Sequence, residues 1–167
     1  MKTKKILIWI ACVGISLALG CTSPSVFHLK KNPWVINRPQ SLTMSYMRFT
    51  YTVYQDSGGI YVIGRAYPRK NKIPPWGRWA DEIWLGVYLC DARGSILAKD
   101  IRIFPPQEIT SNGFPFTFII RPQRFGGPGP LYITFGYRLK ITDPPFSRGK
   151  YDRPRVFFAI EKAQKLP

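Results

Sequence analysis

The sequence predicts an all-β protein built as one antiparallel β-sandwich of about seven strands. Several runs of branched and aromatic residues alternate apolar and polar side chains with a period of two, which is typical of half-buried strands. Clusters of Gly, Asp, Asn and Pro separate these runs at short intervals. No stretch shows sustained helical spacing of apolar residues. A chain of 167 residues also suits a single domain with one core.

The first two predicted strands form a hairpin. "YMRFTYTVY" (46–54) and "IYVIGRAY" (60–67) are both rich in β-branched and aromatic residues. The segment "QDSGG" between them supplies turn residues at 56–59. We therefore expect these two strands to pair.

The next predicted strand occupies a central position in its sheet. "IWLGVYLC" (83–90) places apolar side chains on both faces, as expected for a strand with neighbours on either side. The turn "DARG" then leads into "SILAKDIRIF" (95–104), with Asp91 expected to cap the turn and Gly94 to adopt a positive φ. A second hairpin is predicted here.

Three further strands complete the set: "FPFTFII" (114–120), "LYITFGYRLKI" (131–141) and "RVFFAI" (155–160). The second of these has the clearest period of two in the chain. Seven such strands with turns between them predict a sandwich of immunoglobulin-like or transthyretin-like type, in which each sheet buries one face. The strand order is left open at this point.

The N-terminus carries the features of a secretory signal. Lys2, Lys4 and Lys5 precede an apolar run at 6–19, and small residues follow it. The run has fourteen residues, too few for a transmembrane helix, which needs about 20. Residues 1–20 are therefore predicted to be a signal peptide, so the protein is exported.

The stretch "LALGC" resembles the lipobox of bacterial lipoproteins. This resemblance implies that Cys21 is acylated, with palmitate as a typical chain, and becomes the new N-terminus. Thr22, where many inner-membrane lipoproteins have Asp, implies transfer to the outer membrane, facing the periplasm. The alternative is an ordinary signal peptide that is cut nearby and leaves Cys21 unmodified.

The predicted mature chain has three parts. Residues 21–41 contain three prolines and are predicted to be a tether, although their apolar residues could also dock on the domain or at a lipid surface. Residues 42–162 form the sandwich domain and 163–167 a charged tail. Without the three signal lysines, 22 Lys and Arg oppose 9 Asp and Glu, a net charge of +13. This charge favours anionic partners, and in an envelope compartment those are acidic proteins or lipid headgroups, with no nucleic acid.

No catalytic, metal-binding or cofactor-binding set emerges from the sequence. His28 is the single histidine and lies in the predicted tether, so it has no partner for a metal site or a catalytic triad. Asp81 and Glu82 are adjacent, and alternation in a strand would direct them to opposite faces. Cys90 is expected to be a small buried hydrophobe. The "GGPG" segment is expected to be a loop and not a phosphate-binding turn. An envelope hydrolase is therefore disfavoured.

The function that the sequence still favours is recognition of a partner by the protein surface, and the basic loops are the candidates for this role. Lys and Arg concentrate in "PRKNKIPPWGRW" and "FSRGKYDRPR", the first of which also contains two tryptophans. Tryptophans beside arginines are typical of protein anchor points or membrane-interface contacts, the alternative being that they fold back over the edge of the sandwich. The candidate interaction residues are Arg69, Lys70, Lys72, Trp76, Arg78, Trp79, Arg148, Lys150, Arg153 and Arg155.

The hairpin "LGVYLCDARGSILAKD", followed by "NGFPFTFII", resembles two groups of small secreted β-sandwich modules: the FxLyD-type domains and the pilotin-like lipoproteins. The second resemblance implies a lipoprotein that escorts a secretin subunit to the outer membrane. The sequence thus predicts a non-enzymatic, lipid-anchored binding or assembly module of the bacterial envelope, with a pilotin-like escort as the narrower alternative.

Overall fold

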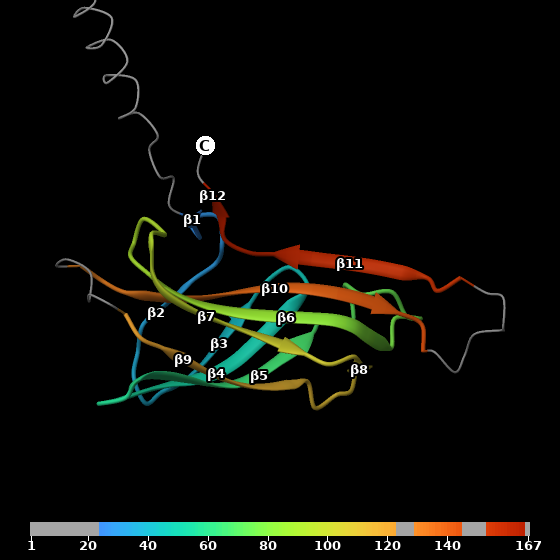
Figure 1. Cartoon of the computed structure of the whole chain (residues 1–167), viewed down its shortest axis with the longest axis horizontal. Coiled ribbons are helices and arrows are strands. Elements are labelled where there is room, and N and C mark those ends of the chain that lie inside the picture. Colours follow the sequence, from blue (N-terminus) through green and yellow to red (C-terminus); the bar gives the residue numbers. More distant parts are fainter. Residues whose placement is uncertain (1–23, 123–128, 145–152, 166–167) are drawn as a thin grey trace, which may run out of the picture.

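The computed structural model describes residues 24–122, 129–144 and 153–165. Within these residues the protein consists of strands and connecting loops, with no helix (Figure 1). The strands are β1 (Pro24–Ser25), β2 (Asn32–Pro33), β3 (Pro39–Thr43), β4 (Met47–Asp56), β5 (Gly59–Pro68), β6 (Trp79–Cys90), β7 (Ile96–Phe104), β8 (Gln107–Glu108), β9 (Phe114–Ile120), β10 (Tyr132–Thr142), β11 (Val156–Glu161) and β12 (Gln164–Lys165).

Two antiparallel sheets pack face to face, which confirms the predicted all-β sandwich (Figure 1). The larger sheet has the order β11-β10-β6-β7, with β2 added beside β10 and β8 beside β6. The smaller sheet has the order β3-β4-β5-β9. The chain crosses between the sheets after β2, β5, β8 and β9, whereas β3, β4 and β5 follow one another within the smaller sheet. A further pair, β1-β12, joins the two ends of the described chain.

The core between the sheets is centred on aromatic rings from both layers. Phe49 of β4 stacks on Phe135 of β10, with 4.3 Å between centroids and 5° between the ring planes. Tyr51 meets the same Phe135 edge-on at 4.9 Å, and Phe116 of β9 lies 5.6 Å from it. Phe49 and Phe135 are fully buried. These rings fix the packing of the two sheets because aromatic pairs stabilise beyond the area they bury.

Both predicted hairpins are confirmed. β4 and β5 pair along their whole length across the turn that starts at Asp56. β6 lies between β10 and β7, as expected for a strand that is apolar on both faces. In the β6–β7 turn, Gly94 has a φ of 82° and Ser95 N donates to Asp91 Oδ1 at 2.9 Å. Burial opposes ionisation of Asp91, but the hydrogen bonds from Ser95 and Arg93 outweigh it and lower the pKa of Asp91.

The described part of the predicted tether packs on the sandwich. The sequence placed the start of the domain at residue 42, whereas Val26 is fully buried and Leu29 is 5% exposed in the core cluster. Ser25 and Val26 bond to the β6–β7 turn, where Ser25 Oγ and Val26 N both donate to Gly94 O, at 3.1 and 2.9 Å. Prolines prevent a long strand here, but the apolar side chains between them still bury themselves. Part of the predicted tether therefore belongs to the packed core of the sandwich.

A polar network centred on the buried side chain of Tyr137 attaches the edge strand β11 to the turn between β3 and β4. Tyr137 Oη donates to Glu161 Oε2 at 2.6 Å and accepts from Tyr46 N at 3.0 Å. Ser45 donates to the same carboxylate from its backbone N, at 3.1 Å, and from its Oγ, at 2.8 Å. Burial and the bond to Glu161 raise the pKa of Tyr137, which stays a neutral donor.

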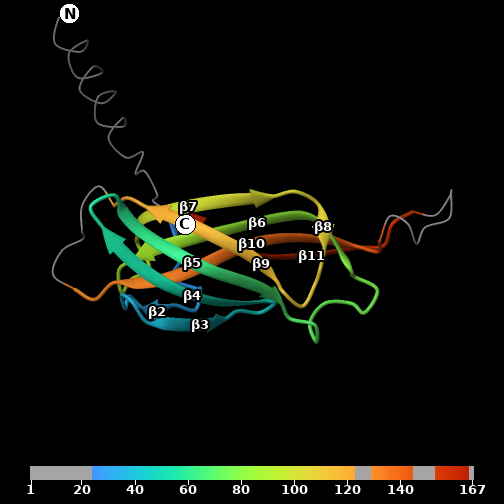
Figure 2. The same ribbon diagram turned by 90° about the horizontal axis from the view of Figure 1, so that it is seen from below.

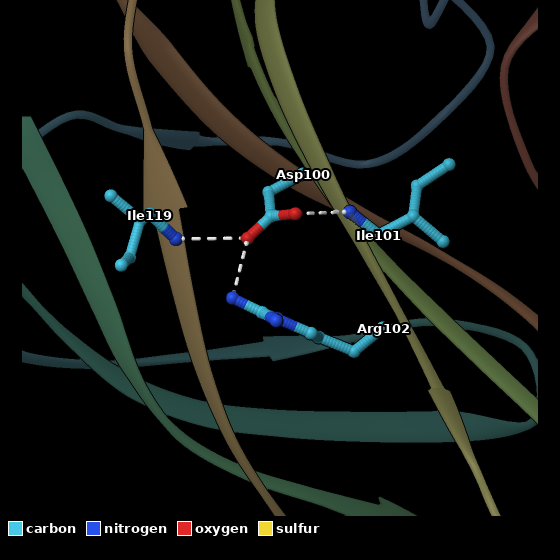
Figure 3. A network of polar contacts seen from close by, with 4 residues as sticks. All are labelled: Asp100, Ile101, Arg102 and Ile119. Carbon is cyan, nitrogen blue, oxygen red and sulfur yellow. Dashed lines mark hydrogen bonds and ion pairs between the residues drawn. The ribbon is translucent and has the colours of Figure 1, made fainter.

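The free edge of β9 is protected by Asp100 of β7 (Figure 3). Asp100 Oδ2 accepts from Ile119 N at 2.9 Å and lies 3.4 Å from Arg102 Nη2, while Oδ1 accepts from Ile101 N at 2.8 Å. Amide groups alternate direction along a strand, so position 115 also faces this edge, and it is a proline with no N–H to offer. An inward-pointing acid and an edge proline both discourage pairing with other chains.

The two ends of the sandwich carry different segments (Figure 2). The loop at 69–78, the end of β10 and the start of β11 lie at one end. The start of the described chain lies toward the other, at the β6–β7 turn. β6 connects these two ends with twelve residues, a span of about 36 Å at the usual rise of a strand.

Candidate basic interaction surface

The basic loop at 69–78 is held in a fixed shape by its own backbone. Lys72 N and Ile73 N both donate to Arg69 O, at 2.8 and 3.2 Å. Gly77 N donates to Pro74 O at 2.9 Å, which closes a second turn. Ile73 packs against the core cluster. The loop therefore presents its cations on an ordered framework and needs little further ordering on binding.

Arg69 fastens this loop to the turn between β3 and β4. Its Nη1 donates to Met44 O at 2.9 Å and to Ser45 O at 3.0 Å. Its backbone N donates to Tyr46 O at 2.8 Å. One guanidinium nitrogen thus holds two carbonyls, so Arg69 has a structural role as well as a charge.

Two hollows lie on either side of Arg69. We call the first, of about 440 Å³, the Arg48 hollow; it is lined by Thr43, Arg48, Tyr67, Pro68, Arg69, Lys70, Asn71, Thr110 and Ser111. The second, of about 280 Å³, is the Lys72 hollow, lined by Lys30, Met44, Ser45, Tyr46, Arg69 and Lys72.

The lining of both hollows is cationic without compensating acids. No Asp or Glu is among the residues that line them. Within the described ranges, Lys70 and Lys72 have no ion pair within 4.0 Å. In the Arg48 hollow the guanidinium of Arg48 lies 5.1 Å from the ring centroid of Tyr67, which orients it. Residues with hydroxyl groups also line this hollow, so the chemistry suits a carboxylate or another anion.

The second predicted basic segment reaches the same end through Arg155. Its guanidinium lies 5.0 Å from the ring centroid of Trp76. Its backbone N donates to Asp143 Oδ1 at 3.1 Å, and its Nε lies 3.8 Å from Asp143 Oδ2. The structure thus brings the loop at 69–78 and the segment before β11 into contact.

The predicted residues divide by accessibility. Lys70, Lys72, Arg78, Arg153 and Arg155 are exposed. Arg69 is half-buried, as are both predicted tryptophans, Trp76 and Trp79. Both tryptophans are therefore only partly accessible to a partner. Arg148, Lys150 and Cys21 lie outside the described residues.

Sequence reasoning missed most of the lining of the hollows, namely Lys30, Thr43, Arg48, Tyr67, Thr110 and Ser111. The sequence could have predicted one part of this lining, the pairing of Arg48 with Tyr67. Because the β4–β5 hairpin turns between Asp56 and Gly59, its register follows from counting outward and places Arg48 opposite Tyr67. The contributions of Lys30 and Thr110 depend on the crossing of distant segments, which no local pattern reports.

The carboxylate pair in β6 differs from the expectation. Asp81 and Glu82 were expected on opposite faces, yet both pair with cations of one face of β10: Lys140 Nζ lies 2.7 Å from Asp81 Oδ2, and Arg138 Nε 3.2 Å from Glu82 Oε1. The register shifts between Lys140 and the next residue, so a bulge at Asp81 breaks the alternation. Both acids therefore have their partners on β10.

The other potentially reactive side chains, His28 and Cys90, are hydrogen-bonded or buried. His28 Nε2 lies 3.1 Å from Lys162 O. Cys90 is fully buried, and burial, moderated by the nearby Lys31, raises the pKa of its thiol to about 11. Among the residues that the structure describes, no group of three or more His, Cys, Asp or Glu could hold a metal ion. In the same residues no helix is long and apolar enough to cross a membrane.

Comparisons with known proteins found nothing similar to this chain. No protein-family model matches it, and searches of curated proteins and of solved structures found no match. The resemblances to lipoproteins, FxLyD-type domains and pilotins therefore stay predictions from the sequence, and arguments about function depend on the surface itself.

Proposed function

We propose that the protein is a non-enzymatic, lipid-anchored binding or assembly module of the bacterial envelope. In this proposal its basic end, formed by Arg48, the loop at 69–78, Arg153 and Arg155, engages an acidic protein partner. The observation that carries the proposal is a set of five cations around two hollows that no acid lines: Lys30, Arg48, Arg69, Lys70 and Lys72. Desolvated anchor residues of this kind, Arg and Trp above all, dominate the energetics of protein interfaces.

The position of the chain start supports the same proposal. Residue 24 docks at the β6–β7 turn, whereas the basic loop precedes the first residue of β6. A lipid on Cys21 would hold the molecule near the first of these ends, and the basic end would stay about 36 Å away along the sheet. An arrangement of this kind leaves the basic end free for a partner while the protein is anchored.

The chemistry of the acids and the thiol supports a non-enzymatic role. Asp81 and Glu82 are engaged in ion pairs, and Asp91 holds its own turn. Cys90 has a pKa far above neutral pH, so its thiolate is scarce. None of these groups lines the two hollows of the basic end.

Affinity purification of the tagged, full-length protein from membranes tests the proposal. Wild-type protein is expected to retain a stoichiometric acidic protein at low salt and to release it as salt rises. Lys70→Glu with Lys72→Glu should abolish this capture. Arg38→Glu with Arg93→Glu, which changes two exposed cations at other sites by the same total charge, should preserve it.

Equal loss of capture in both double variants would refute the role of the basic end, because it would assign binding to net charge alone. The absence of any stoichiometric partner under mild conditions would refute the binding function. Recovery of an outer-membrane secretin as the partner would identify the pilotin-like alternative.

A further inference from the structure

The outer face of the larger sheet exposes an apolar patch that the proposed function does not use. Nine large hydrophobic residues of the described chain are exposed, and five of them lie on this one face. They come from the two edge strands: Ile101 and Ile103 of β7, and Val156, Phe158 and Ile160 of β11, with exposures between 41% and 69%. We call this set the outer-face patch.

The register of the sheet shows that the patch has two parts, one on each edge strand, with β6 and β10 between them. Ile103 lies opposite Trp84, Trp84 opposite Arg138, and Arg138 opposite Ile160, so one cross-strand row joins the two edges. The neighbouring row contains Ile101 and the pair Gly86 and Gly136, which form part of the lining of a hollow of about 100 Å³. A Cβ on Gly136 would lie 2.9 Å from the ring of Tyr88, so this position requires glycine.

Charge on this face is neutralised at the centre and positive at the rim. Arg138 and Lys140 are paired with Glu82 and Asp81, as described above. Lys99 of β7 faces the same side, because it lies opposite Tyr88, and it is exposed. Lys162, after β11, is exposed as well and lines the small hollow. Exposed apolar side chains beside long cationic side chains are typical of surfaces that lie at a membrane interface.

The N-terminal segment crosses the remaining part of the same face. Thr134 Oγ1, which points outward from β10, donates to Lys30 O at 2.6 Å. Phe27, three residues before Lys30 in the same segment, is 69% exposed. Pro24 starts the described chain on this side of the molecule, above the larger sheet in Figure 1. Cys21 precedes it by three residues, which extended chain spans in about 10 Å.

We propose that the outer face of the larger sheet lies on the surface of an anionic phospholipid bilayer. Phe27 and the outer-face patch then reach the boundary between headgroups and acyl chains, and Lys99 and Lys162 contact phosphates. The proposal rests on the proposed lipid at Cys21, because the short connection would hold this face at the membrane. The excess of 22 cationic over 9 acidic residues after the signal favours an anionic bilayer over a second copy of the same basic chain.

Tryptophan fluorescence of the full-length, lipidated protein tests the contact. The protein is reconstituted into vesicles of phosphatidylglycerol and phosphatidylcholine, with the acyl chains of the phosphatidylcholine either brominated or not. Bromine quenches indoles near the acyl chains, so emission is expected to fall on the brominated vesicles. Trp84→Phe should remove most of that difference, whereas Trp79→Phe, at the basic end, should preserve it.

A second measurement is independent of the lipid. The secreted chain with Cys21→Ser contains every described strand, and its folding is verified by circular dichroism. Its partition onto the same vesicles should fall about tenfold in the double variant Ile103→Ser with Phe158→Ser. The matched control, Tyr54→Ser with Ile63→Ser, removes two exposed apolar residues from the opposite sheet and should leave partition unchanged.

The outcomes separate the two proposals. An acylated Cys21, shown by intact mass, together with no quenching on brominated vesicles would overturn the membrane-facing sheet and leave the binding function intact. An unmodified Cys21 together with the expected partition differences would overturn the proposed lipid anchor. It would still support contact of the outer face of the larger sheet with the bilayer. Equal partition of both double variants, or a concentration-dependent dimer that is lost in Ile103→Ser with Phe158→Ser, would overturn the bilayer contact.

Discussion

Replacing Tyr137 with Phe tests whether the polar network at Glu161 holds the edge strand β11 in place. The hydroxyl of Tyr137 is the hub of this network, since it donates to Glu161 Oε2 and accepts from Tyr46 N. The ring is 2% exposed and lies 6.4 Å from Phe49, centroid to centroid. The Tyr137→Phe change keeps that ring, so it removes hydrogen bonds without creating a cavity of note.

The expected loss follows from the two bonds. A hydrogen bond to a charged group contributes about 1.5 to 3 kcal/mol, and a buried N–H left without its acceptor adds a further cost. The two effects share one atom and do not add fully, so we expect the free energy of unfolding to fall by about 3 kcal/mol. For a domain of this size that corresponds to a decrease in Tm of roughly 10 °C.

Urea and thermal unfolding followed by circular dichroism measure this difference. Tyr54→Phe is the matched control, because Tyr54 is 45% exposed and its hydroxyl remains hydrated, so the expected change is under about 0.5 kcal/mol. If Tyr137→Phe were as stable as Tyr54→Phe, the network would contribute nothing and the attachment of β11 would need another explanation.

Three further predictions concern pH, the thiol and the sheet edge. Burial raises the pKa of Tyr51 to about 12, so its contribution to stability is complete below pH 10 and is lost as the pH rises toward 12; urea midpoints across this range should fall accordingly. Cys90 should react with a thiol reagent at pH 8 only after unfolding, because it is buried and its pKa is about 11. Asp100→Ala should cost about 1 to 2 kcal/mol by leaving Ile119 N without its acceptor and should increase light scattering at high concentration. Asp100→Asn keeps one acceptor oxygen, which can still bond to Ile119 N, but it turns an NH2 group toward Ile101 N, so it should lose less stability than Asp100→Ala and leave the scattering unchanged.

Local patterns predicted the hairpins because all the information lies within about twenty residues of sequence. The β4–β5 and β6–β7 pairs each combine alternation with a short turn, and Gly94 has the positive φ that its turn requires. The central position of β6 followed from apolar side chains on both of its faces.

The N-terminal strands were missed for a physical reason. β1, β2 and β3 each contain a proline, so their sequence is typical of a linker. They are held by distant partners, such as β10 beside β2, which local propensity does not report. The bulge at Asp81 was also invisible, because a single extra residue leaves the surrounding alternation intact.

In the candidate site, too, some features follow from local sequence and others depend on contacts between distant segments. Its charges were evident from the sequence, but its shape depends on where segments cross. Arg69 illustrates this, since nothing local indicates that its guanidinium binds the carbonyls of Met44 and Ser45. The outer-face patch was likewise hidden, because Phe158 and Ile160 alternate as well as any core strand. The structure shows that, among the described residues, no further layer covers the larger sheet on this side, and this is why Phe158 and Ile160 are exposed.

The proposed membrane face and the basic end can act at the same time because they share no side chain. Ile103 lies opposite Trp84, five residues or about 16 Å along β6 from the start of that strand beside the basic loop, and the guanidinium bonds of Arg69 keep that loop in one shape. If the larger sheet lies flat on the bilayer, the basic end of the sandwich points along the membrane surface. A neighbouring envelope protein can then contact it. Sites more than about 10 Å apart with no common partner contribute independently. The free-energy effects of Ile103→Ser and Lys70→Glu should therefore add for vesicle-bound partner capture, and a coupling well above about 0.5 kcal/mol would show that both surfaces belong to one interface.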